Sequence, residues 1–409
     1  MTLDTDTAPS SGGSTSRVLE RAVARIAAGP TAPPGACLAV SCRGRIEFAA
    51  RGVAQAFDDA GPLAEPEPVT PRTRADIGSV TKILATTAAL MALVDAGELT
   101  LERRLLELLP WTAATPCADA TVAQLLAHRA GLWEWWPLYL SVPAADPDAA
   151  LRAAAALPLR YAPEHGRHYS DLGFMLLGAV VVAVAGRAGA TIADVASELV
   201  LGPLGLTSTA YGRAARGAPV MASSNGDQIE RRMIATGEPY PVDVDGDRFT
   251  GWREHVLVGE VNDGNAFHAF GGAAGHAGLF STAEDLLRFG DSLLDALRGD
   301  AGDDDARPLA QADVVRRFLT AGADPGQGLG LRRWLLDDGD VAWGHTGFPG
   351  VAVAILPALG ASVALVTNRL HVRGTPSATE PIWERALRAA RDHCLSRSAS
   401  SGERKPTWT

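Results

Sequence analysis

A serine and a lysine three residues apart, Ser79 and Lys82, precede the apolar run Ile83 to Val94. If this stretch is a helix, positions i and i+3 share one face, so the Ser79 hydroxyl and the Lys82 ammonium can meet. A serine hydroxyl needs an adjacent base to become a good nucleophile. A lysine can act as that base only if burial or a neighbouring charge lowers its pKa. The spacing therefore indicates a candidate nucleophile, although Ser-x-x-Lys also occurs in helices where the serine is a cap.

Three further segments could contribute groups to a site around Ser79. Tyr169-Ser170-Asp171 directly precedes the apolar run Leu172 to Ala185, so its polar side chains lie at a predicted helix N-terminus. Gly344-His345-Thr346-Gly347 lies between two predicted strands, where glycines let a substrate approach the backbone closely. The third segment is the Gly-rich run Gly271 to Gly278, just before a capped helix.

The apolar pattern predicts strands near both ends of the chain and helices between them. A helix is expected over Val18 to Ala28, and another near the C-terminus with Ile382, Ala386, Ala390 and Cys394 on one stripe. The predicted strands are Ala36 to Ser41 and Arg45 to Ala50, joined like a hairpin at Arg43-Gly44, then Asp340 to Trp343, Val351 to Leu356 and Ser362 to Thr367. We therefore predict an α/β (α+β) protein with one sheet built from both termini and an inserted helical domain.

The corresponding domain boundaries follow from these elements. We expect a sheet domain over 18–85 and 300–395, an inserted mainly helical domain over 86–299, and disordered tails at 1–17 and 396–409. Within the inserted part, Gly212 to Gly272 has little periodicity and many Gly, Pro and Asp residues. A loop this long inside a compact domain is usually functional, so we expect a pocket wall or lid.

Composition and charge exclude several partners. The 409 residues carry a formal charge of −10 without a Lys/Arg block, so neither nucleic acid nor an anionic membrane is expected to bind. The longest uncharged apolar run, Leu172 to Gly186, is too short to span a membrane and is interpreted as a buried helix. Met1 to Ser16 lacks an apolar h-region and is interpreted as a disordered tail, which favours a cytoplasmic location.

The four cysteines also favour a cytoplasmic location. Cys37, Cys42, Cys117 and Cys394 show neither CxxC nor His-rich metal spacing, so no metal or other cofactor is predicted. We expect free, mostly buried thiols in a reducing compartment.

In their order and spacing, the motifs resemble the serine β-lactamase and penicillin-binding-protein superfamily, most closely class C β-lactamases and family VIII carboxylesterases. Ser79-x-x-Lys82 resembles the nucleophile motif, Tyr169-x-Asp171 the Tyr-x-Asn motif, and His345-Thr346-Gly347 the Lys/His-Thr/Ser-Gly strand. Leu125 to Leu132 and Gly275 to Thr282 also resemble recurrent family segments. The chain has no Gly-x-Ser-x-Gly, which argues against an α/β-hydrolase.

The resemblance implies an antiparallel sheet flanked by helices, with the site between this sheet and an inserted helical domain. It implies that Ser79 forms an acyl-enzyme, with Lys82 and Tyr169 as the general base pair. The Lys82 ammonium would lower the pKa of Tyr169 enough for the phenol to accept the serine proton. The oxyanion hole would be the backbone N–H groups of Ser79 and of Phe348, which follows Gly347.

Asp171 departs from the family pattern, because it replaces an asparagine. An amide can donate a hydrogen bond to the side-chain carbonyl of a β-lactam, whereas a carboxylate cannot. The carboxylate would also keep Lys82 protonated, which favours Tyr169 as the base. This departure argues against a cell-wall peptidase or an exported β-lactamase. The alternative is that Asp171 only caps the helix beginning at Leu172.

The remaining candidates have two interpretations each. His345 either contacts the substrate or tunes Tyr169, as the family lysine does, or it only shapes its strand. We expect His276 to be structural and bonded within its Gly-rich loop, and His128 to be a structural polar anchor. Trp133, Trp135 and Trp136 could line an acyl pocket or pack under a loop.

The sequence thus favours a cytoplasmic esterase- or amidase-like enzyme that acts on a small ester or amide. One alternative is a transacylase of specialised metabolism, which passes the acyl group to an amine or alcohol. A pocket that excludes water would favour transfer. The other alternative is a sensor whose serine is acylated by a β-lactam-type ligand and never released.

Overall fold

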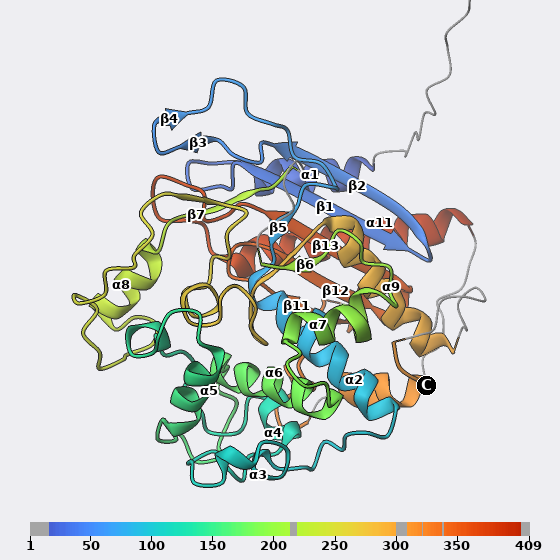
Figure 1. Cartoon of the computed structure of the whole chain (residues 1–409). Helices are drawn as coiled ribbons and strands as arrows, with labels where there is room; N and C mark the ends of the chain where they lie inside the picture. The colour runs from blue at the N-terminus through green and yellow to red at the C-terminus, as the bar shows by residue number, and fades with distance from the viewer. Residues whose placement is uncertain (1–15, 213–218, 300–308, 321, 338, 402–409) are drawn as a thin grey trace, which may run out of the picture.

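The computed structural model describes residues 16–212, 219–299, 309–320, 322–337 and 339–401. Residues 1–15 of the tail predicted at 1–17, and residues 402–409 of the tail predicted at 396–409, lie outside these ranges. Figure 1 shows that the first and last parts of the chain together form one sheet, and that the middle of the chain extends from it.

One six-stranded antiparallel sheet forms the centre of the fold. The two termini meet where Ala36 pairs with Thr367. In sheet order, the strands are β10 (Arg332–Leu335), β11 (Val341–Thr346), β12 (Ala352–Leu356), β13 (Ala361–Thr367), β1 (Gly35–Cys42) and β2 (Arg45–Gly52). The predicted sheet built from both termini is therefore confirmed, including the hairpin at Arg43-Gly44, whose positive φ angles suit a two-residue turn.

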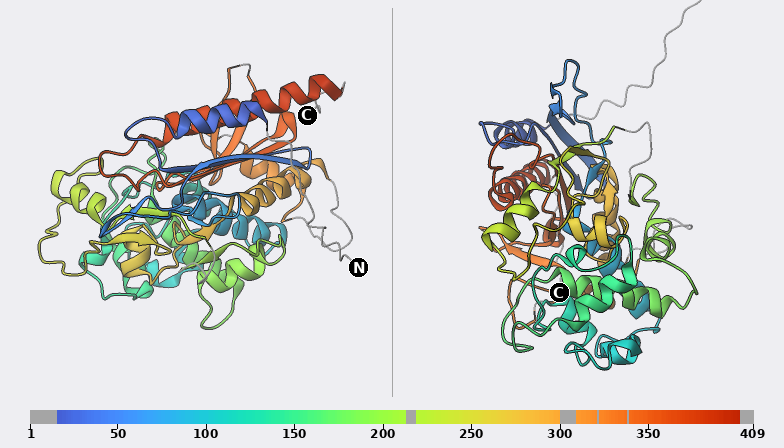
Figure 2. Two further views of the ribbon diagram at one scale, coloured as in Figure 1. Left: turned by 90° about the horizontal axis from the view of Figure 1, so that it is seen from above. Right: turned by 60° about the vertical axis from the view of Figure 1, so that its left-hand side comes forward.

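Helices cover both faces of this sheet (Figure 2). On one face, α1 (Arg17–Ile26) and α11 (Thr379–Ser401) lie side by side and bury a shared apolar cluster. The predicted stripe of α11 forms part of that cluster. On the other face lie α9 (Ala283–Arg298) and α2 (Ala88–Asp95), which belong to the main core.

Two predicted boundaries differ from this packing. The boundary at residue 299 places α9 in the inserted domain, yet α9 packs on β1, β12 and β13. The reason is its apolar stripe, including Leu286 and Leu293, which is buried against the sheet. The predicted C-terminal tail begins at 396, but α11 continues to Ser401. The division into two domains otherwise stays a prediction.

Between the sheet segments, the chain is mainly helical, as predicted. The helices are α3 (Leu105–Leu108), α4 (Val122–Leu126), α5 (Pro147–Ala156), α6 (Asp171–Ala185) and α7 (Ile192–Ala196), with short turns η3 (Pro110–Thr112), η4 (Leu138–Leu140) and η5 (Ser197–Leu201). The central helix is α6, which is apolar on most sides and largely buried. Among the described residues, one helical stretch, Gly78–Asp95, is long and apolar enough to cross a membrane, but most of it is buried inside the fold.

The long segment from Gly212 to Gly272 is less irregular than predicted. Its described residues form β7 (Ala222–Asn225), α8 (Gln228–Thr236), β8 (Val256–Val258) and η6 (Asn265–Ala269). The helix α8, in which no residue is buried, is not predicted from the sequence. Figure 1 shows α8 at the edge of the molecule, away from the sheet.

Short β-strands pair with one another and hold the loops around Ser79 in place. In a three-stranded sheet, β9 (Leu279–Ser281) pairs with β5 (Ala75–Asp76) and β6 (Ala210–Tyr211). The residue Ile77 then donates its N–H to the carbonyl of Leu279. The remaining short elements are β3 (Phe57–Asp58), β4 (Gly61–Pro62) and η7 (Pro357–Leu359). The pairing of β5 with β9 holds the Ser79 turn next to the Gly-rich loop.

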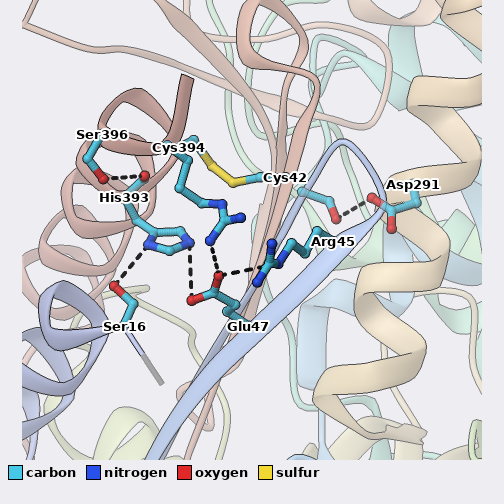
Figure 3. Close-up of a disulfide and its surroundings, with 10 residues drawn as sticks. Ser16, Cys42, Arg45, Glu47, Asp291, His393, Cys394 and Ser396 are labelled. Atoms are coloured by element: carbon cyan, nitrogen blue, oxygen red, sulfur yellow. Dashed lines mark hydrogen bonds and ion pairs between the residues drawn. A yellow bond between two sulfur atoms is a disulfide. The ribbon is translucent and has the colours of Figure 1, made fainter. Parts of the chain in front are cut away.

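The prediction of four free thiols is wrong for two of them. Cys42 at the end of β1 and Cys394 on α11 form a disulfide, while Cys37 and Cys117 are free and buried (Figure 3). The sequence hid this pair because 352 residues separate the two cysteines and only the fold brings them together. Disulfides persist mainly in oxidising compartments. The cysteines therefore no longer support the cytoplasmic location, which stays a prediction.

Candidate active site

Ser79 lies in the first turn of the helix that continues into α2. The turn begins as a 3₁₀ helix over Gly78–Val80 (η1) and passes through a π-helical stretch over Lys82–Thr87 (η2). Such π stretches are frequent at functional sites. The predicted i,i+3 contact is present, because Lys82 Nζ donates a hydrogen bond to Ser79 Oγ over 2.8 Å.

Lys82 is fully buried, and three acceptors surround its ammonium. Besides Ser79 Oγ, these are Asp171 Oδ1 at 2.7 Å and the carbonyl oxygen of His276 at 3.2 Å. An ammonium has three N–H donors and no acceptor, so all of its donors have partners. Burial lowers the pKa of Lys82, but the charge of Asp171, assisted by Tyr169, outweighs burial and raises it. Lys82 is therefore held as an ammonium.

Tyr169 lies beside this ammonium, with Lys82 Nζ 4.9 Å from the centre of its ring. Burial raises the pKa of Tyr169, and the charge of Lys82 only partly offsets this effect. The expectation that the pKa of Tyr169 is lowered is therefore wrong for the resting site. The sequence indicated the neighbouring charge correctly but not the desolvation of this phenol, which is partly buried.

Asp171 is the first residue of α6 and points to Lys82 rather than back to its own helix. The N-cap is Ser170, whose Oγ accepts a hydrogen bond from the N–H of Gly173 over 3.1 Å. Because another residue fills the capping role, the ion pair with Lys82 is the main contact of Asp171. The alternative that Asp171 only caps the helix is thereby disfavoured.

The end of β11 lies against the Ser79 turn. A Cβ built on Gly347 would lie 2.1 Å from the carbonyl oxygen of Ile77, so only glycine fits there. A Cβ on Gly78, whose φ is +48°, would lie 3.3 Å from the backbone nitrogen of Phe348. The two segments thus meet through their backbones, and the N–H groups of Ser79 and Phe348 come from adjoining turns, as the predicted oxyanion hole requires.

His345 is buried on β11, with its ring centre 5.8 Å from that of Tyr169. Its Nδ1 lies 2.7 Å from the carbonyl oxygen of Thr346, so Nδ1 carries the proton and Nε2 is an acceptor. Burial, with help from the Lys82 charge, lowers the pKa of His345 to about 3. His345 is therefore neutral and cannot supply the positive charge of the family lysine.

The other two histidines hold loops in place. The Nδ1 of His128 accepts a hydrogen bond from the N–H of Ser170 over 3.0 Å, which fits the predicted polar anchor. The Nε2 of His276 lies 3.0 Å from Asp263 Oδ1. The expectation that His276 bonds within its own Gly-rich loop is therefore wrong, because Asp263 precedes that loop.

A cavity of about 670 Å³ opens beside Ser79. It is lined by Gly78, Ser79, Trp135, Tyr169, Asp171, Ile229, Glu230, Arg232, Met233, Thr236, Glu238, Pro239, Tyr240, Asn262, Asp263, Ala277, Phe348 and Pro349. Trp135 is thus a pocket residue, whereas Trp133 and Trp136 pack edge to face against each other. The segment predicted as a pocket wall does line the cavity, but its individual residues, above all those of α8, could not be predicted.

A second cavity, of about 320 Å³, also borders Ser79. Its lining includes His345, Thr346 and two arginines, Arg167 and Arg332, that sequence reasoning did not identify. Arg332 pairs with Glu380, and Arg167 Nε lies 3.2 Å from Asp324 Oδ2. A guanidinium has five N–H donors, so both side chains retain donors for a further anion.

No group of three or more His, Cys, Asp or Glu side chains in the described ranges could hold a metal ion. Ser79 and its neighbours combine a hydroxyl, a buried ammonium, a phenol and adjoining backbone N–H groups beside a cavity, as acyl transfer through a serine requires.

The chain as a whole is similar to known proteins. The family model described as "Beta-lactamase" matches residues 23–387. A relative named "N-acetylmuramyl-L-alanine amidase" from Bacillus subtilis (strain 168) is 30% identical over 361 residues, covering 83% of this chain and 78% of the relative. A "Putative D-alanyl-D-alanine carboxypeptidase" from Escherichia coli (strain K12) is 29% identical over 343 residues, covering 78% of this chain and 74% of the relative.

A solved structure supports the same fold. The structure titled "Crystal structure of SurE with D-Leu" superposes with a TM-score of 0.63 at 25% identity, covering 92% of this chain and 74% of the other. The matches confirm the predicted superfamily and its antiparallel sheet with flanking helices, and they support an enzyme. The chain belongs to the β-lactamase family of serine hydrolases.

Proposed function

We propose that this protein forms an acyl-enzyme on Ser79 from a small amide or ester and releases it by hydrolysis. The observation that carries the proposal is the position of the buried Lys82 ammonium, 2.8 Å from Ser79 Oγ and 2.7 Å from Asp171 Oδ1, at the edge of an open cavity. A buried charge in this position is costly unless it is paired. The ion pair thus supports a catalytic rather than a merely structural role.

The proton chemistry follows from the protonation states. Because Lys82 is an ammonium and Tyr169 is a neutral phenol in the resting site, neither can accept the serine proton. In the reactive form, Lys82 and Tyr169 together have lost one proton, so that the phenolate of Tyr169 lies next to the ammonium of Lys82. Tyr169 then takes the proton of Ser79 during attack and returns it to the leaving group. The N–H groups of Ser79 and Phe348 stabilise the oxyanion.

The second cavity supports a leaving group that carries a carboxylate. His345 is neutral, so the positive charge near Thr346 comes from Arg167 and Arg332 instead. Guanidinium groups bind carboxylates well. Two relatives fit this substrate class, because one is named as a D-alanyl-D-alanine carboxypeptidase and a similar structure contains D-Leu. We therefore propose amides or short peptides with a C-terminal carboxylate as preferred substrates.

Transfer to an amine is a second candidate function. The larger cavity has an aromatic and aliphatic wall that includes Trp135, Met233 and Tyr240, and such a wall can exclude water from the acyl-enzyme. An amine bound there would then compete with water for the ester. A β-lactam-type sensor remains the third candidate, which differs from both because its acyl-enzyme would not turn over.

A turnover panel separates these functions. The purified protein is incubated with p-nitrophenyl esters, D-amino acid amides, dipeptides and penicillins, with and without added amines, and products are measured by mass spectrometry. We expect hydrolysis with multiple turnovers and highest kcat/KM for substrates with a terminal carboxylate. New amide products formed in preference to acid would establish the transacylase, and a single burst without turnover would establish the sensor.

A further inference from the structure

One carboxylate–imidazole pair near the site lies outside the three motifs that carry Ser79, Tyr169 and His345. Asp263 Oδ1 accepts a hydrogen bond from the N–H of Ala266 over 2.8 Å and lies 3.0 Å from His276 Nε2. The residue His276 is 1% exposed, so its imidazole is shielded from water. Burial raises the pKa of Asp263, but the charge and hydrogen bond of His276 outweigh burial and lower it to about 2. The carboxylate of Asp263 therefore stays ionised beside the imidazole of His276.

The backbone of His276 touches the catalytic lysine. Its carbonyl oxygen is the third acceptor of Lys82 Nζ, at 3.2 Å, and the preceding carbonyl, of Gly275, accepts from Thr86 Oγ1 over 2.7 Å. On the other side, a Cβ on Gly275 would lie 2.2 Å from the carbonyl oxygen of Phe174, so the loop lies tightly against α6. The Gly-rich loop thus lies between the helix that carries Lys82 and α6. The contact of the His276 imidazole with Asp263 holds the loop from a third direction.

We propose that Asp263 and His276 are positioning residues that hold the His276 carbonyl against the Lys82 ammonium and thereby keep the lysine aligned with Ser79. This inference rests on the proposed function and deepens it, because it assigns a task to two residues outside the three family motifs. Asp263 also acts on Lys82 through its charge. The charged and titratable groups that interact with Lys82 are Asp171, Tyr169, Tyr240, His128, His345 and Asp263.

The same region contains a matched pair without this contact. His268 Nε2 lies 3.0 Å from Asp227 Oδ2, the same separation as in the pair of His276 and Asp263. His268 packs on Tyr139 and Phe249 and makes no hydrogen bond to Ser79, Lys82 or Tyr169 among the described contacts. Substitution of His268 therefore reproduces the loss of a buried carboxylate–imidazole pair without the link to Lys82.

The test compares acylation by p-nitrophenyl acetate in four variants. His276→Leu removes the donor to Asp263, His276→Gln keeps an N–H donor, His268→Leu is the control, and Asp263→Asn removes the charge. We expect His276→Leu to lower the acylation rate about 10- to 100-fold, as for a misplaced catalytic group. His276→Gln should recover much of this loss, and His268→Leu should stay within about twofold of wild type. Stopped-flow release of p-nitrophenol gives the rates.

The pH dependence supplies a second readout that a purely structural role would not change. Asp263→Asn removes a negative charge that favours the ammonium, so the alkaline rise of the acylation rate should move to lower pH. Equal rates and an unchanged profile in folded His276 and Asp263 variants would overturn the inference, as would an equal loss in His268→Leu. If wild-type protein shows no acylation of Ser79, the proposed function fails instead, so the two failures are distinguishable. If His276→Leu does not fold, the Asp263→Asn profile alone decides.

Discussion

Lys82 Nζ lies 2.7 Å from Asp171 Oδ1, and this contact keeps the lysine protonated. The family motif that the sequence resembles has a neutral asparagine at this position. Here the carboxylate raises the pKa of Lys82 against the opposing effect of burial. In the proposed mechanism the lysine consequently acts as a fixed positive charge, and Tyr169 accepts the serine proton. Asp171 is the first residue of α6, and Tyr169 precedes its N-cap.

The first prediction concerns Lys82 and Tyr169 as a unit. Lys82→Ala and Tyr169→Phe should each reduce acylation by roughly 10²- to 10⁴-fold, the usual contribution of a general base. The double variant should lose little more than either single variant, because cooperating catalytic groups are strongly non-additive. Single-turnover rates of all three variants test this. If the two losses multiply in the double variant, the residues act independently.

The second prediction concerns Asp171 and pH. The acylation rate should rise towards alkaline pH, because Lys82 and Tyr169 together must lose one proton before Tyr169 can act as the base. Asp171 raises the pKa of Lys82 and also contributes, after burial, to the raised pKa of Tyr169. Asp171→Asn removes this negative charge, so the pair loses its proton more easily and the alkaline rise should move to lower pH. A pH–rate profile of the variant measures the shift.

Ser170→Ala is the matched control for Asp171→Asn. Loss of this cap should cost about 1 kcal/mol of stability without moving the pH–rate profile. If the pH–rate profile of Asp171→Asn does not shift and its stability falls by a similar amount, Asp171 acts only on the helix end.

The third prediction concerns Arg332 in the second cavity. Arg332→Leu should lower kcat/KM for a dipeptide with a free carboxylate by roughly 10- to 100-fold, because hydrogen bonds to charged groups contribute about 1.5–3 kcal/mol. The rate with p-nitrophenyl acetate, which lacks the carboxylate, should change little. Arg333→Leu on the same strand is the control, since Arg333 does not line the cavity. Equal losses with both substrates would show that Arg332 does not bind the substrate carboxylate.

The fourth prediction concerns the disulfide between Cys42 and Cys394. The Cys42→Ser/Cys394→Ser protein should lose about 2–4 kcal/mol of unfolding free energy and keep its acylation rate. At the same helix end, buried Glu47 also lies against His393 (Figure 3) and forms an ion pair with Arg397, so α11 should remain folded. Denaturant unfolding with and without reductant measures the difference. If reductant destabilises the double variant as much as wild type, breaking this disulfide is not what lowers the unfolding free energy.

The sequence was sufficient to predict the elements that carry the motifs. The helix stripe ending at Cys394 follows from helical periodicity. The buried strands of the central sheet and the buried helix after Asp171 follow from continuous apolar runs, because both sides of these elements are buried. The i,i+3 spacing of Ser79 and Lys82 likewise predicted their contact, since it depends on local helical geometry alone.

Properties that depend on packing across the fold could not be predicted. The sign of the Tyr169 pKa shift depends mainly on desolvation of the phenol, which the local sequence does not show. The partner of His276 is Asp263, from a segment without clear periodicity, and α8 has no buried face that packing would require. The disulfide joins residues from opposite ends of the chain, and connectivity cannot be deduced from spacing alone.

The central claim is that Ser79 carries the acyl group, and intact-mass spectrometry of the acid-quenched protein tests it most directly. After brief exposure to p-nitrophenyl acetate or a penicillin, the account predicts one added acyl group per chain, located on Ser79 by peptide mapping. Ser79→Ala, folded by circular dichroism, should show no adduct and no turnover. An adduct on another residue, or turnover by Ser79→Ala close to that of wild type, would contradict the account.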